Sequence, residues 1–280
     1  MSGTLYIVAT PIGNLEDLAP RARQTLGSVD LVAAEDTRHT GQLLSHFGID
    51  TPQFALHEHN EQRLAEQLVA RLEAGESIAL VSDAGTPLVS DPGYRLVKLA
   101  HERSITVSPI PGASALTAAL SAAGLPTDRF CFEGFLPAKS KARLNALTAL
   151  QNETRTLVFY ESVHRIVDTL ADMIEVFGAD RAAFVGRELS KLHEQCMKAP
   201  IGDLARALAR GELAEKGEFV VVVAGASSAN TPAVDVDRLL VELSGKLPDG
   251  EIAKALARAT GAKRNALYQR LLDIAGSRDP

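Results

Sequence analysis

VSDAGTPLVSDPG, residues 81–93, lies between a short apolar run at 78–81 and an amphipathic run at 94–100. Its two glycines allow backbone conformations that are closed to other residues, and its two prolines fix φ and remove hydrogen-bond donors. Asp91 followed by Pro92 is typical of a helix N-cap and first helical position. The stretch therefore predicts a strand that ends in a stiff loop before a helix begins. Such a loop presents backbone N–H and C=O groups to a small polar ligand.

Length and composition bound the class of protein. A chain of 280 residues is long enough for about two domains, and 46% hydrophobic with 23% charged residues is ordinary for a globular protein. No apolar run approaches the roughly 18 residues of a membrane span, and the N-terminal residues do not form a secretion signal. Cys131 and Cys196 are far apart and form no C-x-x-C pair, which favours a reduced, cytoplasmic setting.

Strand-like and helix-like runs alternate along most of the chain, which predicts an α/β fold with a largely parallel sheet. The apolar run Val220–Val223 is typical of a strand buried on both faces. The strand-like runs are 5–9, 31–34, 78–81, 105–107, 130–132, 156–160, 183–185 and 219–223. Helical patterns include 62–72, 94–100, 113–123 and 163–177.

Two breaks suggest the domain organisation. A turn cluster at 124–128 predicts a boundary between two α/β lobes, 1–124 and 125–226, and a small polar stretch predicts a linker at 227–234. Three helical patterns follow in a third module, 235–280, where Leu267, Leu271 and Ile274 share one face. Residues 244–280 carry seven basic and four acidic side chains, although the whole chain has a net charge of −6. This contrast indicates either a module that contacts an anionic partner or a solvated helical face.

Four loops rich in Gly, Pro and small polar residues follow strand-like runs, at 10–14, 35–38, 83–93 and 109–114. Ligands of open α/β sheets lie beyond the carboxyl ends of the strands, so these loops predict a binding cleft. Neither G-x-x-x-x-G-K-[ST] nor G-x-G-x-x-G occurs in the chain. A nucleotide-like ligand without phosphates fits this pattern best.

Three other groups of residues are candidates for chemistry. His57 and His59 could share one face of a strand and hold a metal ion, but no third ligand can be named, so we predict no metal. Residues 161–165 lie where a strand passes into a helix. Residues 187–194 place five ionisable side chains in eight positions. They form either a surface cluster of ion pairs or a functional set that acts in acid/base chemistry or contacts phosphate. No G-x-S-x-G elbow supports a Ser-His-Asp triad.

Nine segments of the chain resemble the ribosomal RNA small subunit methyltransferase I family, and together they run nearly from end to end. That family belongs to the tetrapyrrole-methylase-like, or class III, S-adenosylmethionine methyltransferases. The combination of TPIGN, AEDTRHTG and SDAGTPLVSDPG is highly specific. The segments are LYIVATPIGNLEDL (5–18), AAEDTRHTGQLLSHFGI (33–49), ALHEHNE (55–61), LVSDAGTPLVSDPG (80–93), LSAAGLPTDRFCFEGFLPAKSKAR (120–143), TLVFYESVHR (156–165), RELSK (187–191), KGEFVVVV (216–223) and KRNALYQ (263–269).

The resemblance implies two α/β lobes of the tetrapyrrole methylase fold with S-adenosylmethionine in the cleft between them. It also implies a homodimer and a small C-terminal helical domain that helps to grip RNA. The implied reaction is methylation of the ribose 2′-oxygen of a cytidine in 16S rRNA, near the decoding centre of the small ribosomal subunit. No metal and no membrane contact are implied.

The resemblance also assigns cofactor contacts residue by residue. They are Pro11, Ala84, Gly85, Thr86, Val89, Ser114, Ala115, Glu161 and Gly202. The chain has TPIGN where tetrapyrrole enzymes have a glycine-rich first loop, and Thr86 where they have Asp. Both departures favour the RNA branch of the fold.

A ribose 2′-hydroxyl is a poor nucleophile at neutral pH, so a base or a cation near the developing alkoxide would help the reaction. Our candidates are Glu188 as base, Lys191 as its electrostatic partner and Arg187 on a phosphate. Two alternatives remain open. A small-molecule methylase of the same fold would have little use for a basic tail or for Lys139, Lys141 and Arg143. A ribosome-assembly factor would bind RNA and keep S-adenosylmethionine as a structural ligand only.

Overall fold

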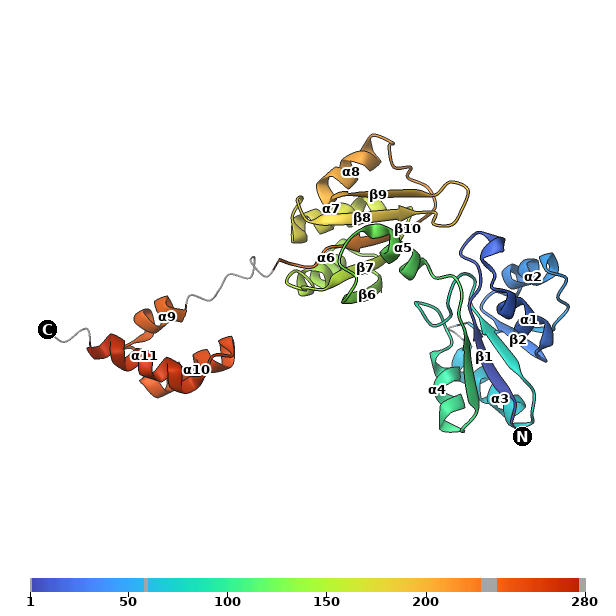
Figure 1. Ribbon diagram of the computed structural model, residues 1–280, viewed down its shortest axis with the longest axis horizontal. Coiled ribbons are helices and arrows are strands. Elements are labelled where there is room, and N and C mark those ends of the chain that lie inside the picture. The colour runs from blue at the N-terminus through green and yellow to red at the C-terminus, as the bar shows by residue number, and fades with distance from the viewer. Residues whose placement is uncertain (1, 58–59, 228–235, 277–280) are drawn as a thin grey trace. The chain divides into compact units, whose positions relative to one another are not determined.

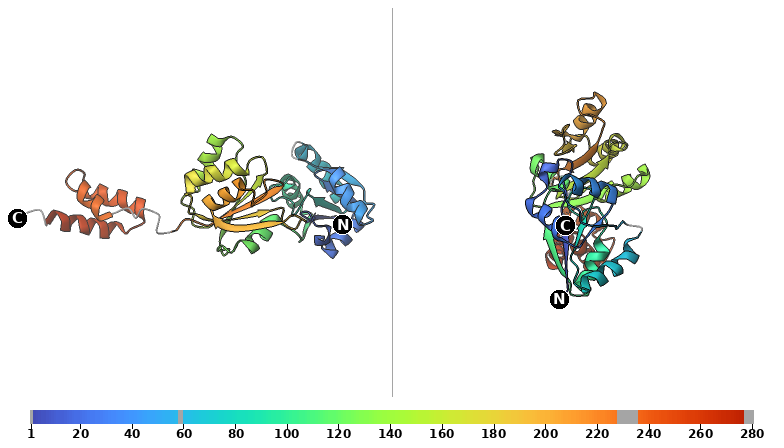
Figure 2. Two further views of the ribbon diagram at one scale, coloured as in Figure 1. Left: turned by 90° about the horizontal axis from the view of Figure 1, so that it is seen from above. Right: turned by 90° about the vertical axis from the view of Figure 1, so that its right-hand side faces the viewer.

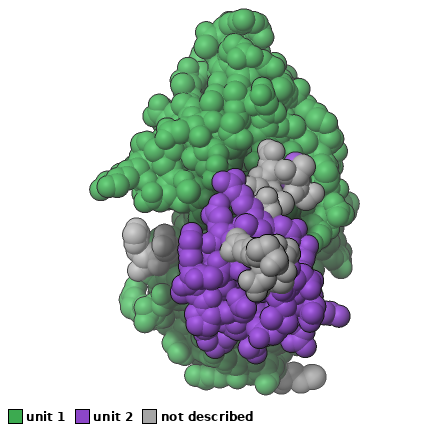
Figure 3. Space-filling view, turned by 90° about the vertical axis from the view of Figure 1, so that its left-hand side faces the viewer, with its two compact units in different colours: residues 1–226 green, residues 227–280 purple. Residues whose placement is uncertain are grey.

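The computed structural model describes residues 2–57, 60–227 and 236–276. The chain divides into two compact units, residues 1–226 and 227–280, which are coloured separately in Figure 3. The first unit holds two lobes, each built on a five-stranded sheet. None of the helices among the described residues combines the length and apolar character that a membrane crossing needs.

The first lobe is a parallel sheet with helices on both faces (Figure 1). Its strand order is β3-β2-β4-β1-β5, and every pairing is parallel. The strands are β1 (Thr4–Val8), β2 (Leu31–Ala34), β3 (Gln53–Ala55), β4 (Ile78–Val81) and β5 (Thr106–Ile110). The helices are the short 3₁₀ turn η1 (Leu15–Asp17), α1 (Pro20–Ser28), α2 (Thr37–His46), α3 (Glu61–Glu73) and α4 (Tyr94–Glu102).

The central strands of this lobe are apolar without alternation because both faces are covered. All four residues of β2 and of β4 are buried. Leu80 packs with α3 and α4 on one face, whereas Val81 packs with α1 and α2 on the other. The predicted parallel sheet is therefore confirmed in this lobe.

The second lobe departs from that prediction because its sheet is mixed. The strand order is β6-β7-β10-β8-β9; β6 and β7 pair in parallel, and the other three pairings are antiparallel. The strands are β6 (Phe130–Phe135), β7 (Thr156–Ser162), β8 (Ala182–Arg187), β9 (Gln195–Pro200) and β10 (Glu218–Val223). The helices are α5 (Ala115–Ala123), α6 (Ser140–Ala149), α7 (Ile166–Phe177) and α8 (Ile201–Ala209). As predicted, Val220–Val223 is buried throughout.

Helices again cover both faces of this second sheet (Figures 1 and 2). Val221 packs in a core with α6, α7 and α8, and Val222 packs on the opposite face with α5. Although α5 precedes residue 124, it belongs to the second sheet by packing. The packed boundary between the lobes therefore falls one helix earlier than the turn cluster at 124–128.

In its described part, residues 236–276, the second unit contains three helices, α9 (Val236–Leu243), α10 (Asp249–Thr260) and α11 (Arg264–Gly276). Their shared core includes Leu240, Leu256, Leu267 and Leu271, so the apolar face predicted for the last helix is confirmed. Gly261 ends α10 in the left-handed conformation and lets the chain turn directly into α11. Most of the predicted linker, residues 228–234, lies outside the described residues.

Candidate functional site

A cavity of about 370 Å³ lies between the two lobes of the first unit. It opens at the carboxyl ends of β4, β7 and β8, where the loops of α/β folds carry ligand sites. The first lobe and its last loop contribute Ile12, Glu35, Asp83, Ala84, Gly85, Thr86, Val89, Ser90, Asp91 and Ser114. The second lobe contributes Ala115, Phe135, Tyr160, Glu161, Ser162, Gly186, Leu189, Glu218, Phe219 and Val220.

The loop at 81–93 forms much of the wall and is held in a strained conformation. Gly85 and Gly93 have φ of 84° and 126°, which confirms the expectation that these positions need glycine. Leu88 and Ser90 also have positive φ, 72° and 70°, which is uncommon for residues with side chains. Strain of this kind persists only where the surroundings enforce it, and it concentrates at ligand sites.

Backbone contacts fix this loop against the other loops of the cavity. Thr10 and Gly85 form a two-bond β-bridge, with N···O distances of 2.9 and 3.1 Å. The Thr86 hydroxyl donates to the carbonyl of Ala113 at 3.1 Å. The loops after β1, β4 and β5 are therefore tied together around the cavity.

The helix after the loop begins differently from our expectation. Asp91 is not its N-cap; α4 begins at Tyr94 and its N-cap is Gly93, with no capping side chain of its own. Instead, Glu61 of α3 accepts hydrogen bonds from the N–H groups of Arg95 (2.6 Å) and Leu96 (3.4 Å). Because that carboxylate already satisfies the helix end, Asp91 is left to line the cavity.

Three carboxylates gather on the first-lobe wall. Asp83 accepts from the N–H of Asp36 at 3.0 Å, and its own N–H donates to Glu35 at 3.4 Å. Burial raises the pKa of Asp91 to about 6; the charges of Glu35 and Asp83 act in the same direction, and a hydrogen bond with Ser82 opposes them. Burial and the charge of Asp83 also raise the pKa of Glu35. The wall therefore attracts a cationic ligand and repels a phosphate.

An aromatic group forms the opposite side. The Tyr160 hydroxyl accepts from the N–H of Leu116, in the first turn of α5, at 3.1 Å. Phe132 and Phe135 contact the Tyr160 ring edge to face, with centroids 4.9 and 5.7 Å away. Burial raises the pKa of Tyr160, so its hydroxyl stays neutral at physiological pH.

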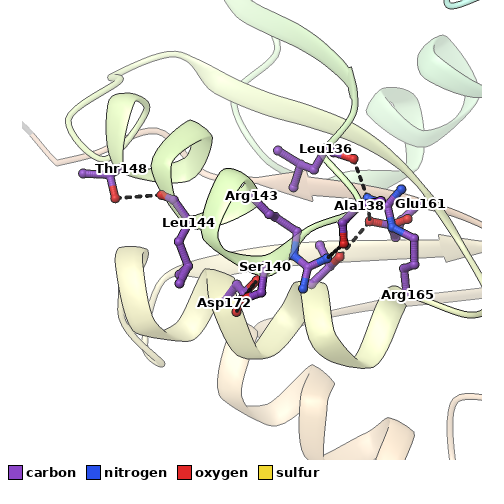
Figure 4. A network of polar contacts seen from close by, with 10 residues as sticks. Leu136, Ala138, Ser140, Arg143, Leu144, Thr148, Glu161, Arg165 and Asp172 are labelled. Atoms are coloured by element: carbon purple, nitrogen blue, oxygen red, sulfur yellow. Dashed lines mark hydrogen bonds and ion pairs between the residues drawn. The ribbon is translucent and has the colours of Figure 1, made fainter.

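Glu161 lines the cavity, yet its carboxylate turns into the second lobe (Figure 4). The side chain is 0% exposed, pairs with Arg165 at 3.3 Å and accepts from the Thr169 hydroxyl at 2.7 Å. Any contact of Glu161 with a ligand would therefore come from its backbone. The same close-up shows Arg143 turned inward onto Asp172 at 2.6 Å, so Arg143 is not an exposed basic residue.

Seven of the nine predicted cofactor contacts line this cavity. They are Ala84, Gly85, Thr86, Val89, Ser114, Ala115 and Glu161. Pro11 is buried beside Ile12, which takes the lining position. Gly202 lies in the first turn of α8, where its N–H donates to the carbonyl of Ala179. That turn adjoins the start of β8, whereas the cavity meets β8 near its end at Gly186, so the structure does not bring Gly202 to the site.

The structure corrects the phosphate role expected for Arg187. Its residue surface is only 6% exposed, and its guanidinium donates to the carbonyls of Lys216 and His193 and to the Gln195 side chain. Arg187 thus holds the loop between β8 and β9 in place from inside. A guanidinium bound in this way does not reach an external phosphate.

Glu188 and Lys191 are brought together, as predicted, at 2.9 Å. Lys191 also pairs with Glu218 at 2.9 Å, and Glu188 accepts from the N–H of Glu218 at 2.9 Å. Partial burial would raise the pKa of Glu188, but the N–H of Glu218 and the Lys191 ammonium outweigh it and hold the pKa below its usual value. Glu188 is therefore a weaker base than our hypothesis requires. Of this network, Glu218 lines the cavity.

Glu35, Asp83 and Asp91 were not predicted as charged cavity residues, although the loops that hold them were. The available signal was position, because Glu35 and Asp83 follow the ends of β2 and β4, which are neighbours in the sheet. For the metal alternative, Glu58 and His59 lie outside the described residues. Among the residues that the structure does describe, no three His, Cys, Asp or Glu side chains are grouped to hold a metal ion.

Known proteins match this chain over nearly its whole length. Residues 4–205 match the family model of the tetrapyrrole (corrin/porphyrin) methylases, and residues 230–275 match the RsmI C-terminal HTH domain. Ribosomal RNA small subunit methyltransferase I of Escherichia coli O157:H7 is 53% identical over 276 residues, covering 98% of this chain and 96% of the relative. The protein of that name from Pseudomonas aeruginosa is 50% identical, covering 98% and 99%.

Solved structures agree on the fold of the first unit. A diphthine synthase matches with a TM-score of 0.61 at 16% identity, covering 79% of this chain and 90% of that one. Uroporphyrin-III-C-methyltransferase from Thermus thermophilus matches with a TM-score of 0.57 at 20% identity, covering 79% and 94%. The fold, the two matched domains and the full-length relatives lead to one conclusion: the chain belongs to the ribosomal RNA small subunit methyltransferase I family, on the tetrapyrrole methylase fold.

Proposed function

We propose that this protein transfers the methyl group of S-adenosylmethionine to the ribose 2′-oxygen of a cytidine in 16S rRNA of the small ribosomal subunit. The observation that carries the proposal is the carboxylate-walled cavity between the lobes, in a chain whose relatives are named for methylation of that subunit's RNA. A structure of uroporphyrin-III C-methyltransferase with the same fold is described as complexed with S-adenosyl homocysteine.

The cavity suits this cofactor in size and charge. Pockets for small ligands measure about 300–1,000 Å³, and this one has about 370 Å³. S-adenosylmethionine carries a sulfonium, an ammonium and a carboxylate but no phosphate. Asp83 and Asp91 complement the cationic groups, the N-terminus of α5 at Ser114 suits the carboxylate, and the small Ala84 and Gly85 allow close backbone approach.

When bound, the cofactor supplies an already activated methyl group, so the protein mainly has to position the ribose oxygen in line with it. We propose that Lys191 stabilises charge on that oxygen from the rim, and that Glu188 holds Lys191 in place. Single-turnover rates on small subunits test this pair. Lys191→Ala and Glu188→Ala should both slow methyl transfer. Wild-type rates in both variants would contradict the roles proposed for Lys191 and Glu188.

The overall activity is tested with small subunits that lack the modification and with cofactor carrying an isotopic methyl label. After incubation, nuclease digestion and mass analysis should find the label in the ribose of one cytidine. Naked 16S rRNA serves as the second substrate. Absence of label on both substrates would contradict the methyltransferase proposal and favour the assembly-factor alternative, whereas label on a base would contradict the 2′-oxygen.

We further propose that the enzyme acts as a homodimer in the cytoplasm, where small subunits are assembled. Light scattering on the purified protein should give twice the chain mass of 29.8 kDa. A single-chain mass at working concentrations would contradict the dimer and leave the methylation proposal unaffected.

A further inference from the structure

One aromatic side chain at the cavity remains largely in contact with solvent. Phe135 lines the cavity, yet it is 56% exposed. A half-exposed aromatic ring beside a cavity offers a flat apolar face that a planar ligand can cover.

The backbone is built to turn Phe135 toward the cavity. Strands β6 and β7 pair regularly up to Phe132, and the register resumes at Gly134, so Glu133 is an inserted residue that forms a β-bulge. Gly134 has φ of 63°, and a side chain at this position would come within 3.0 Å of the Ser90 hydroxyl of the first lobe. Bulges of this kind redirect the following side chain and recur beside active sites.

The segment around Phe135 is also held from behind. Its ring contacts Tyr160 edge to face at 66°, and the Tyr160 hydroxyl is fixed by the N–H of Leu116. The carbonyl of the next residue, Leu136, accepts from Arg165, which pairs with the buried Glu161 (Figure 4). Phe135 therefore presents a preorganised surface rather than a mobile side chain.

Basic side chains follow directly. Lys139 and Lys141 are exposed at the start of α6, whereas Arg143 is buried on Asp172. An exposed aromatic ring followed by exposed lysines is the combination that binds single-stranded nucleic acid, because bases stack on the ring and the cations contact the backbone.

We propose that Phe135 stacks on the base of the target nucleotide once that nucleotide has left its RNA stack, with Lys139 and Lys141 on the adjoining phosphates. This inference rests on the proposed function. RNA helices display their 2′-hydroxyls in the shallow minor groove, but a donor inside a cavity favours an unstacked nucleotide whose ribose can enter, and an extruded base needs a new stacking partner. Phe135 offers one at the cavity mouth.

Kinetics on small subunits and cofactor binding by calorimetry test the inference together. Phe135→Ala should lower kcat/KM for subunits by about 5-fold to 150-fold, the range expected for loss of one base–aromatic stack. Phe135→Tyr should restore most of it, and Phe135→Leu should not. All three variants should bind S-adenosylmethionine as the wild type does. The matched control is Phe130→Ala, since Phe130 is 42% exposed at the other end of β6.

A spectroscopic readout is available because the chain contains no tryptophan. The tryptophan fluorescence of Phe135→Trp should be quenched when it binds subunits, after subtraction of the signal from wild-type enzyme mixed with the same subunits. The fluorescence of Phe130→Trp should not be quenched. Wild-type kinetics in Phe135→Ala, or equal quenching at both positions, would overturn the inference. Weaker cofactor binding in Phe135→Ala would also overturn it, by assigning the ring to the cofactor. If the wild type itself transferred no methyl group, the proposed function would fail instead.

Discussion

Lys191 of the second lobe lies directly over Gly13 of the first. A β-carbon at Gly13 would overlap the aliphatic stem of Lys191, and Gly13 itself has φ of 139°. The neighbouring Ser190 hydroxyl donates to Asp17, so the loop after β8 is docked on the loop after β1. The glycine of the TPIGN loop thus serves to admit a lysine, and the two loops set each other's position at the cavity rim.

Gly13→Ala should consequently reduce activity by displacing Lys191. Backbone strain at such a φ costs about 1–3 kcal/mol, and the overlap adds to it. We expect a lower Tm and a methyl-transfer rate that falls toward that of Lys191→Ala, with cofactor affinity little changed. Gly48→Ala is the control, because Gly48 has φ of 65° but no atom within 4 Å of an added β-carbon. A Gly13→Ala enzyme with normal turnover would show that the position of Lys191 is immaterial.

Asp91→Asn should stabilise the protein in the absence of cofactor. The pKa of Asp91 is raised from 3.8 to about 6, so ionised Asp91 destabilises the folded state. This cost is absent well below pH 3.8, where the group is protonated in both states, grows as the pH rises, and is complete above about pH 6. Thermal melts should therefore show a higher Tm for the variant at pH 7 and a much smaller difference at pH 4. A variant that melts lower at pH 7 would contradict the burial argument.

Cofactor binding should show the opposite pH trend. A cationic ligand favours ionised Asp91 and Glu35, so affinity for S-adenosylmethionine should increase as the pH rises through about 6. Calorimetric titrations between about pH 5 and pH 8 measure it. Asp91→Asn should bind more weakly at pH 8 and have a flatter profile. An unchanged profile would mean that Asp91 does not face the cationic groups.

The capping arrangement gives a fourth prediction. Glu61→Ala removes the acceptor for the N–H groups of Arg95 and Leu96 at the start of α4, and loss of a helix cap costs about 0.5–2 kcal/mol. The free energy of unfolding should fall by that amount. Glu66→Ala, on the exposed face of α3, the helix that carries Glu61, should change the free energy of unfolding little. If Asp91→Ala lost helix stability instead, the assignment of the cap to Glu61 would be wrong.

Local sequence patterns predict some parts of this fold and site but not others. The first sheet was predictable because β2 and β4 are short, wholly buried apolar runs followed by helices. The order of the second sheet was not predictable, because β10, the last of its strands in the chain, lies between β7 and β8 and no local pattern encodes that position. Strand β9 escaped prediction because its residues alternate between half-buried and exposed along a sheet edge. Asp91 carried a genuine local capping signal, but Glu61, thirty positions upstream, occupies the helix end. Long-range contacts thus decided the strand order of the second sheet and the cap of α4.

The helical C-terminal unit should supply electrostatic affinity for the subunit. In a helix-turn-helix the second helix commonly meets the nucleic acid, and α11 begins with Arg264, directly after Lys263, both exposed. Lys263→Ala and Arg264→Ala should each weaken subunit binding and reduce the slope of log K against log salt concentration by about 1. Rates at saturating subunit should stay near the wild type, because the cavity is untouched. Arg238→Ala on α9 is the control, since Arg238 pairs with Glu242 at 3.1 Å. Filter binding at several salt concentrations measures the slopes. An unchanged slope for both Lys263→Ala and Arg264→Ala would mean that these basic residues are only solvated and do not contact the subunit.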